Sequence, residues 1–187
     1  MMNTPNRDSN REPRRDNRDM RPKSEYKDKI LDLRRVTRVV AGGKRMSFRA
    51  TIVIGDEKGH VGIGVGKGLD VAQAMDKGKI KAKKNLIAVP LKGRSIPHEV
   101  LAKYSAAQVI IKPAKLGHGL KAGGSVRDVL LMAGVKDATS KTLGTTKNKL
   151  TNALAAVEAL KKLKESEKKP KKAAAHHAEV EVVEEAK

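Results

Sequence analysis

Apolar and polar residues alternate along three short segments between residues 36 and 66. The segments Val36–Val40, Ser47–Ile54 and His60–Gly66 therefore predict three β-strands, because successive side chains of a strand point to opposite faces. Gly42-Gly43 predicts a tight turn after the first strand, and Asp56-Glu57 lies in the turn before the third. The ordered part of the chain thus begins with a small sheet.

The third of these strands has glycine at every second position. Val61, Ile63 and Val65 share one face and predict a core, whereas the opposite face carries Gly62, Gly64 and Gly66. Glycine weakens a strand interior, so three in alternation indicate that something approaches the sheet closely. In so basic a chain we expect that partner to be a phosphate backbone.

Helical spacing follows from Leu69 to about Asn85. One stripe of this predicted helix is apolar or small: Val71, Met75, Gly78 and Ala82. A second stripe is basic and is formed by Lys77, Lys81 and Lys84, broadened by Lys79 and Lys83. Such a stripe is either a solvated face or a phosphate-binding surface. The lack of an interleaved carboxylate after Asp76 favours phosphate.

A second module follows a linker rich in Pro and Gly. The first module is expected at residues 24–89. Residues 90–107 are expected to hold the linker and the first strand of the second module, and residues 108–164 the rest of that module. Its predicted elements are a strand at Gln108–Pro113, helices at Ser125–Ala133 and Asn148–Lys164, and a strand at Val135–Lys141 between them. The order strand, helix, strand, helix predicts an α+β protein with two small cores.

Charge is concentrated on the predicted modules. The chain has a formal net charge of +20, and residues 24–164 carry 29 basic and 11 acidic residues, a net +18. Such a field attracts polyanions. Residues 1–23 form a basic arm and residues 165–187 a tail, and both have the composition of disordered segments. His176-His177 in that tail lacks a third ligand at useful spacing, so we expect no metal site.

The glycine-rich segment Gly117–Ser125 is the strongest enzyme-like signal. Gly117-x-Gly119-x-x-Ala122 matches a dinucleotide-binding pattern, and Asp137 lies where a ribose-binding acid is expected. The context argues against it, since the turn carries Lys115, His118 and Lys121 and the unit is short. No Walker A motif is present and the chain has no cysteine. With aromatic residues at 2%, recognition of folded RNA through shape and phosphate is favoured over base stacking.

Four motifs occur in one order along the chain. They are Val36-Thr-Arg-Val-Val-Ala-Gly-Gly-Lys-Arg-Met-Ser-Phe, Val61-Gly-Ile-Gly-Val-Gly-Lys-Gly, Ile96-Pro-His-Glu-Val100 and Gly117-x-Gly-x-x-Ala-Gly-Gly-x-x-Arg127-x-Val-Leu-x-x-Ala-Gly-Val135-x-Asp137. This set resembles bacterial small-ribosomal-subunit protein five from about Ile30 to Leu160. The resemblance departs at Lys149, where the family usually has proline, and at Leu154, where it often has arginine.

The resemblance implies an α+β protein with a double-stranded-RNA-binding-like N-terminal module and a strand-helix-strand-helix C-terminal module. It also implies a cytoplasmic, non-enzymatic component of the small ribosomal subunit that binds 16S rRNA at the head-body junction and contributes to translational accuracy. Implied neighbours are small-subunit proteins four and eight, with mRNA near the entry channel as a candidate contact. No cofactor, metal, membrane or small-molecule substrate is expected.

The basic loop, the strands and the first helix are expected to contact rRNA. The glycine-rich turn is expected to contact a neighbouring protein. The expected rRNA-binding residues are Arg38, Gly42, Gly43, Lys44, Arg45, Arg49, Gly62, Gly64, Gly66, Lys67, Lys77, Lys81, Lys84 and Lys121. The expected protein-interface residues are Gly117, Gly119, Gly123, Gly124 and Arg127. Two alternatives remain open: a small nucleotide-binding enzyme using Gly117–Ser125, and a free-standing double-stranded RNA chaperone.

Overall fold

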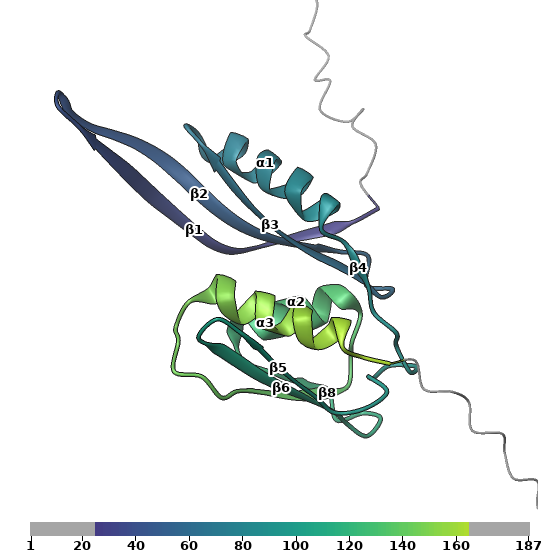
Figure 1. The fold of residues 1–187 in the computed structure, drawn as a ribbon. Coiled ribbons are helices and arrows are strands. Elements are labelled where there is room, and N and C mark those ends of the chain that lie inside the picture. Colours follow the sequence, from purple (N-terminus) through teal and green to yellow (C-terminus); the bar gives the residue numbers. More distant parts are fainter. Residues whose placement is uncertain (1–24, 165–187) are drawn as a thin grey trace, which may run out of the picture.

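The computed structural model describes residues 25–164. The basic N-terminal segment expected at 1–23 and the tail expected at 165–187 lie outside this range. Residues 25–164 form two sheets and three helices, stacked in the order α1, first sheet, α2 with α3, second sheet (Figure 1). The predicted α+β class with two modules is confirmed.

The first sheet has the strand order β1-β2-β3-β4 and is antiparallel throughout. Its strands are β1 (Lys27–Val40), β2 (Gly43–Gly55), β3 (His60–Gly68) and the short β4 (Ile87–Ala88). β1 begins nine residues before the predicted strand, because the entry to the module is extended and pairs with β2 as far as Lys27 and Gly55. The register shifts between Ile30 and Asp32, which marks a β-bulge.

Helix α1 (Val71–Lys84) packs on one face of this sheet. Asp70 caps it by accepting a hydrogen bond from the Val71 N–H at 2.7 Å. Its buried residues Ala74, Gly78 and Ala82 cover Ala50, Ile52 and Ile54 of β2. Gly78 lies under Ile52, whose Cδ1 would be 3.0 Å from a Cβ at that position. Small residues on the helix therefore let it approach the sheet closely.

The expectation that Gly62, Gly64 and Gly66 offer an open surface to phosphate is wrong. All three are buried, and the partner that approaches them is α1. A Cβ at Gly64 would overlap the Gly78 carbonyl oxygen, and a Cβ at Gly66 would overlap the Ala74 carbonyl oxygen. The close approach inferred from the sequence is correct, but it serves helix-on-sheet packing and leaves no room for RNA.

The second module has the strand order β5-β6-β8-β7. β5 (Val100–Tyr104), β6 (Ala107–Pro113) and β8 (Ala138–Thr142) are antiparallel neighbours, and the short β7 (Leu120–Lys121) runs parallel to β8. Helices α2 (Gly124–Ala133) and α3 (Lys149–Lys161) cover one face. β8 starts later than predicted because the N–H groups of Lys136 and Asp137 bond to the Arg94 carbonyl of the linker.

The larger core is shared by the two modules, which corrects the prediction of two separate small cores. Leu31, Val53, Val61 and Ile63 of the first sheet join the buried residues of α2 and α3 in one apolar cluster. The first sheet therefore has both faces covered, one by α1 and the other by the second module. Burial of apolar surface therefore fixes the relative orientation of the two modules.

Two glycines allow backbone contact between the modules. A Cβ at Gly55 would overlap the Met132 carbonyl oxygen, and a Cβ at Gly134 would overlap the Glu57 carbonyl oxygen. Gly134 ends α2 in the left-handed region with φ of 88°, as its predicted place at the helix terminus requires. The Glu57 N–H then donates to the Met132 carbonyl at 3.1 Å, so the turn between β2 and β3 caps α2.

Asp56 organises that turn. Its carboxylate accepts hydrogen bonds from the N–H groups of Lys58 (2.7 Å) and His60 (2.9 Å) and contacts the His60 ring at 2.7 Å. Burial by itself raises the pKa of Asp56, but these hydrogen bonds outweigh it and lower the pKa from 3.8. A lowered pKa stabilises the fold above 3.8, and this contribution is lost as pH falls through the folded-state value.

Gly64→Ala is expected to destabilise the protein by about 2–3 kcal/mol, because the new methyl group must push α1 off the sheet. Urea unfolding followed by circular dichroism measures the change. Gly42→Ala is the matched control, since nothing lies within 4 Å of its added Cβ, and it should change stability by less than about 0.5 kcal/mol. Equal stability of the two variants would contradict this packing.

Candidate nucleic-acid interface

The β1–β2 pair extends beyond the rest of the first sheet as a two-stranded arm (Figure 1). β3 pairs with β2 only as far as Phe48 and Gly68, whereas β1 and β2 continue to the pair Val40 and Gly43. The arm ends at Gly42-Gly43, where Gly43 has φ of 129° and no atom lies within 4 Å of either added Cβ. The predicted basic loop is thus the exposed tip of a long hairpin.

One face of this arm is cationic. Arg34 is paired in register with Arg49, and Arg49 with Lys67, so three cations form a row across β1, β2 and β3. Arg38 and Arg45 form a second row four residues farther out along each strand. The five side chains share a face because strand side chains alternate, and all five residues are exposed. We call Arg34, Arg38, Arg45, Arg49 and Lys67 the arm cation face.

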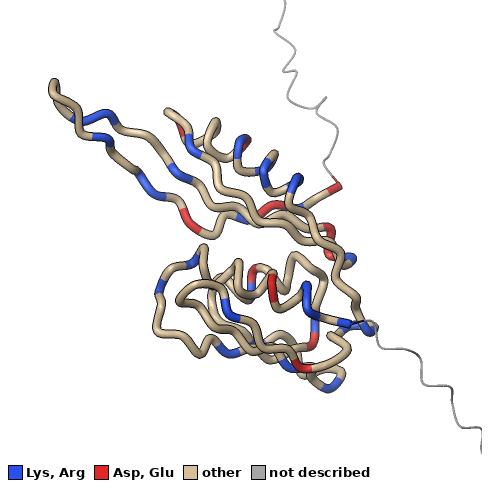
Figure 2. Tube along the Cα trace, viewed as in Figure 1, with Lys and Arg blue, Asp and Glu red and all other residues tan. Residues whose placement is uncertain are grey.

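Like charges placed directly opposite one another repel. Of these five cations, only Arg34 forms an ion pair within residues 25–164, with Asp32 at 2.6 Å. The arrangement is therefore suited to a polyanion that supplies the missing negative charge. In the tube view, Lys and Arg residues are spread along the arm and along α1 (Figure 2).

The predicted lysine stripe of α1 divides into two groups. Lys79 pairs with Asp28 at 3.0 Å, and Lys83 lies 5.9 Å from the Tyr26 ring centroid. Lys77, Lys81 and Lys84 are exposed and form no ion pair with any residue in 25–164. The stripe selected from the sequence is thus the part of α1 that is available to an external anion.

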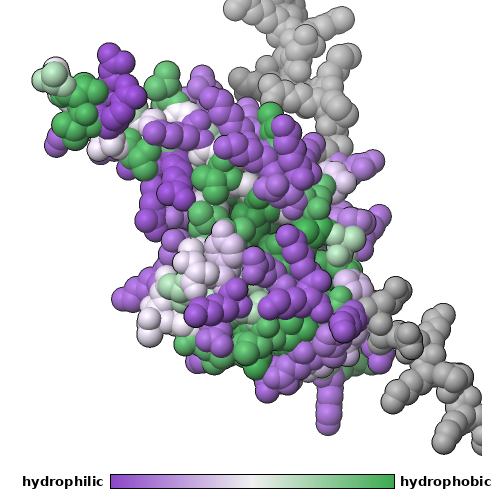
Figure 3. Space-filling view, viewed as in Figure 1, coloured by the Kyte–Doolittle hydropathy of each residue, from purple (hydrophilic) through white to green (hydrophobic). Residues whose placement is uncertain are grey.

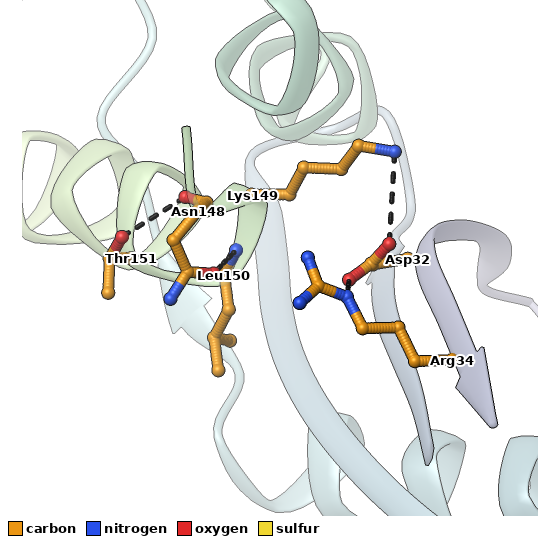
Figure 4. A network of polar contacts seen from close by, with 6 residues as sticks. All are labelled: Asp32, Arg34, Asn148, Lys149, Leu150 and Thr151. Atoms are coloured by element: carbon orange, nitrogen blue, oxygen red, sulfur yellow. Dashed lines mark hydrogen bonds and ion pairs between the residues drawn. The ribbon is translucent and has the colours of Figure 1, made fainter. Parts of the chain in front are cut away.

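Asp32 joins the base of the arm to α3 (Figure 4). One oxygen contacts Arg34, and the other lies 3.9 Å from Lys149 Nζ. Asn148 caps α3 by accepting from the Leu150 N–H at 3.1 Å. Lys149, which replaces the expected proline, thus makes a contact that proline could not.

The Gly117–Ser125 segment forms a structural turn and not a nucleotide-binding site. Gly117 and Gly119 have φ of 84° and 75°, and Gly119 donates its N–H to Asp137 Oδ1 at 2.9 Å. Asp137 is 1% exposed, and Arg94 Nε lies 3.3 Å from its Oδ2. That Arg94 contact lacks hydrogen-bond geometry, since Oδ2 accepts no hydrogen bond within the described chain. Asp137 therefore joins the linker, the turn and β8, and it is not free to bind a ribose.

The remaining predicted residues lie in the second module, apart from the arm. Gly123 and Gly124 are exposed with open space around them, and Arg127 is exposed on α2 without an ion pair in the described chain. Lys121 lies on β7, paired in register with Thr139. Arg34 was missed by sequence reasoning; the alternation Arg34, Val36, Arg38 could have found it if the first strand had been extended toward the N-terminus.

Fold and surface together define a basic, two-module α+β protein with an exposed face suited to polyanions. A family model described as "Ribosomal protein S5, N-terminal domain" matches residues 26–90, and "Ribosomal protein S5, C-terminal domain" matches residues 102–174. The chain belongs to the ribosomal protein S5 family, as the ordered motifs indicated.

Named relatives agree with this assignment. "Small ribosomal subunit protein uS5" of Synechococcus elongatus is 51% identical over 142 residues, which cover 75% of this chain and 78% of the relative. The protein of the same name from Thermosynechococcus vestitus is 47% identical over 81% of this chain and 87% of its own length. "Small ribosomal subunit protein uS5c" of Rhodomonas salina is 48% identical over 81% of this chain and 90% of its own length.

Asp137→Ala should loosen the Gly117–Ser125 turn, because it removes the acceptor of the Gly119 N–H and the charge facing Arg94. We expect a loss of about 1–3 kcal/mol and faster tryptic cleavage after Lys115 or Lys121. Urea unfolding and limited proteolysis measure both effects. Asp76→Ala, at an exposed position of α1, is the control. Unchanged cleavage in Asp137→Ala would show that the carboxylate does not hold the turn.

Proposed function

We propose that this protein is a non-enzymatic structural component of the small ribosomal subunit that binds 16S rRNA at the junction of head and body. The observation that carries the proposal is the arm cation face, five exposed basic residues with one internal carboxylate partner. Family membership supports the subunit and its cytoplasmic setting. Within residues 25–164 no helix is long and apolar enough to cross a membrane.

RNA contact is expected at three places on the first module. These are the hairpin tip at Gly42-Gly43 with Lys44, the arm cation face, and the unpaired lysines of α1. Lysines and arginines that contact phosphates position an RNA without reading its sequence. Lys121 of β7 is a separate candidate contact on the second module, and mRNA near the entry channel is a further candidate contact.

The second module is proposed to meet neighbouring proteins, with small-subunit protein four at the turn and α2 and protein eight as a further neighbour. The support is geometric: Gly117, Gly119, Gly123 and Gly124 have open space around them, and Arg127 is exposed. An arginine in this setting can make a bidentate pair with a carboxylate. If this contact opens when the subunit closes on a codon, it contributes to translational accuracy.

A free-standing RNA chaperone is the less favoured alternative, because it assigns no role to the second module. The shared core packs that module against the first sheet, which suits a component that links two parts of a larger particle. The nucleotide-binding alternative is disfavoured by Asp137, whose Oδ1 accepts from Gly119 and whose side chain is buried.

Replacing Arg38, Arg45 and Arg49 with Ala should weaken RNA binding and reduce the slope of log K against log salt by about 2–3, near 0.9 for each lost phosphate contact. Filter binding to a small-subunit rRNA fragment between about 50 and 200 mM salt measures both quantities. The control is a triple variant in which Lys103, Lys136 and Lys141 are replaced with Ala, because it removes the same charge from exposed positions of the second module. Equal slopes for the two triple variants would contradict the arm cation face.

Arg127→Ala should raise near-cognate misreading roughly two- to fivefold without preventing subunit assembly, because a weaker protein contact favours closure of the subunit. A near-cognate reporter in cells that depend on the variant measures the error. Lys141→Ala, exposed on β8, is the control. Normal accuracy in fully assembled Arg127→Ala subunits would remove the second module from fidelity control.

A further inference from the structure

A groove of about 340 Å³ lies at the junction of the two modules. Its apolar lining comes from Ile63 and Val65 of β3 and from Leu150 and Leu154 of α3. Lys81, Lys84 and Asn85 at the end of α1 complete it, and no acidic residue contributes. In the space-filling view, hydrophobic surface gathers between the modules and is bordered by hydrophilic side chains (Figure 3).

The groove runs along a strand edge that is only partly paired. β4 pairs with β3 at His60 and Val61 alone. Asn85 Nδ2 donates to the Ile63 carbonyl at 3.3 Å, so this carbonyl points away from β2. The backbone of Val65, two residues on, faces the same way, and its N–H and C=O have no partner within the described chain. The groove therefore combines apolar walls with backbone polar groups.

Cations border the groove on two sides. Lys81 and Lys84 are exposed and have no ion pair within residues 25–164. On the strand side, Val65 is followed two residues later by Lys67, which belongs to the arm cation face. The apolar surface is thus continuous with the proposed RNA-binding surface.

We propose that this groove receives one unstacked nucleotide of the bound RNA, an inference that rests on the proposed rRNA-binding function. The base lies against Leu150, Leu154 and the β3 edge, where apolar side chains replace its stacking neighbours. Its flanking phosphates lie beside Lys81 and Lys84. The side-chain oxygen of Asn85 accepts no hydrogen bond from a described residue and is presented to an exocyclic amino group of the base.

A fully paired duplex does not explain these features, since it offers phosphates to the lysines but nothing apolar to the leucines. An extended peptide could add to the β3 edge. Charge favours the nucleotide, because Lys81 and Lys84 contribute to the lining of the groove and no acidic residue does. An apolar ring joined to a phosphate matches a groove with apolar walls and a cationic border.

The test uses two synthetic RNA duplexes of one sequence, one fully paired and one with a single bulged adenosine, bound to the full-length protein. Wild type should bind the bulged RNA roughly tenfold more tightly. Leu154→Trp fills the groove and should remove this preference while leaving affinity for the paired duplex and its salt slope unchanged. Leu131→Trp, at a position of α2 that is 44% exposed, is the control and should keep the preference.

A second readout does not depend on how Leu154→Trp folds. An 8-azidoadenosine at the bulge should cross-link wild-type protein within residues 63–65 or 148–154, as mapped by mass spectrometry. Equal affinity for both duplexes, or cross-links only elsewhere, would overturn the groove and leave the rRNA-binding proposal standing. Failure to bind either duplex would overturn both. Loss of cross-linking when an acidic peptide, but not excess paired duplex, is present during irradiation would assign the groove to a protein partner and also overturn the inference.

Discussion

Burial of both faces of the first sheet is the constraint on which the rest of the structure depends. One face is closed by α1, which approaches so closely that Gly62, Gly64 and Gly66 cannot carry side chains. The other face contributes Val53, Val61 and Ile63 to the core shared with α2 and α3. Apart from the arm, the sheet is covered on both sides, and the two modules cannot separate without exposing a large apolar surface to water.

This constraint decides where an external partner can bind. The accessible parts of the first sheet include the arm beyond Gly68 and the edge of β3, and basic residues lie at both. These arginines and lysines are exposed to water, and a bound polyanion would relieve their mutual repulsion. Packing thus leaves the charge on a protruding arm and along one edge.

Close backbone contacts fix the junction between the modules. Gly55 and Gly134 let the turn at Asp56–Gly59 lie directly on the end of α2, and hydrogen bonds to Asp56 hold that turn in shape. On the second module, Asp137 ties the linker to the Gly117–Ser125 turn in the same way. Both carboxylates thus hold backbone segments in place.

Local features were readable from the sequence because they depend on neighbours along the chain. Alternation predicted the strands, Gly134 predicted the end of α2, and the spacing of Lys77, Lys81 and Lys84 identified the exposed stripe of α1. What lies opposite a residue is set by tertiary contacts. The glycine face of β3 is closed by α1, Arg34 joins Arg49 and Lys67 through strand register, and Asp137 is buried by segments distant in sequence. The sequence by itself therefore determined the main elements, the charge and the family. Only the tertiary structure decided which surfaces stay open, because burial depends on partners that no local pattern specifies.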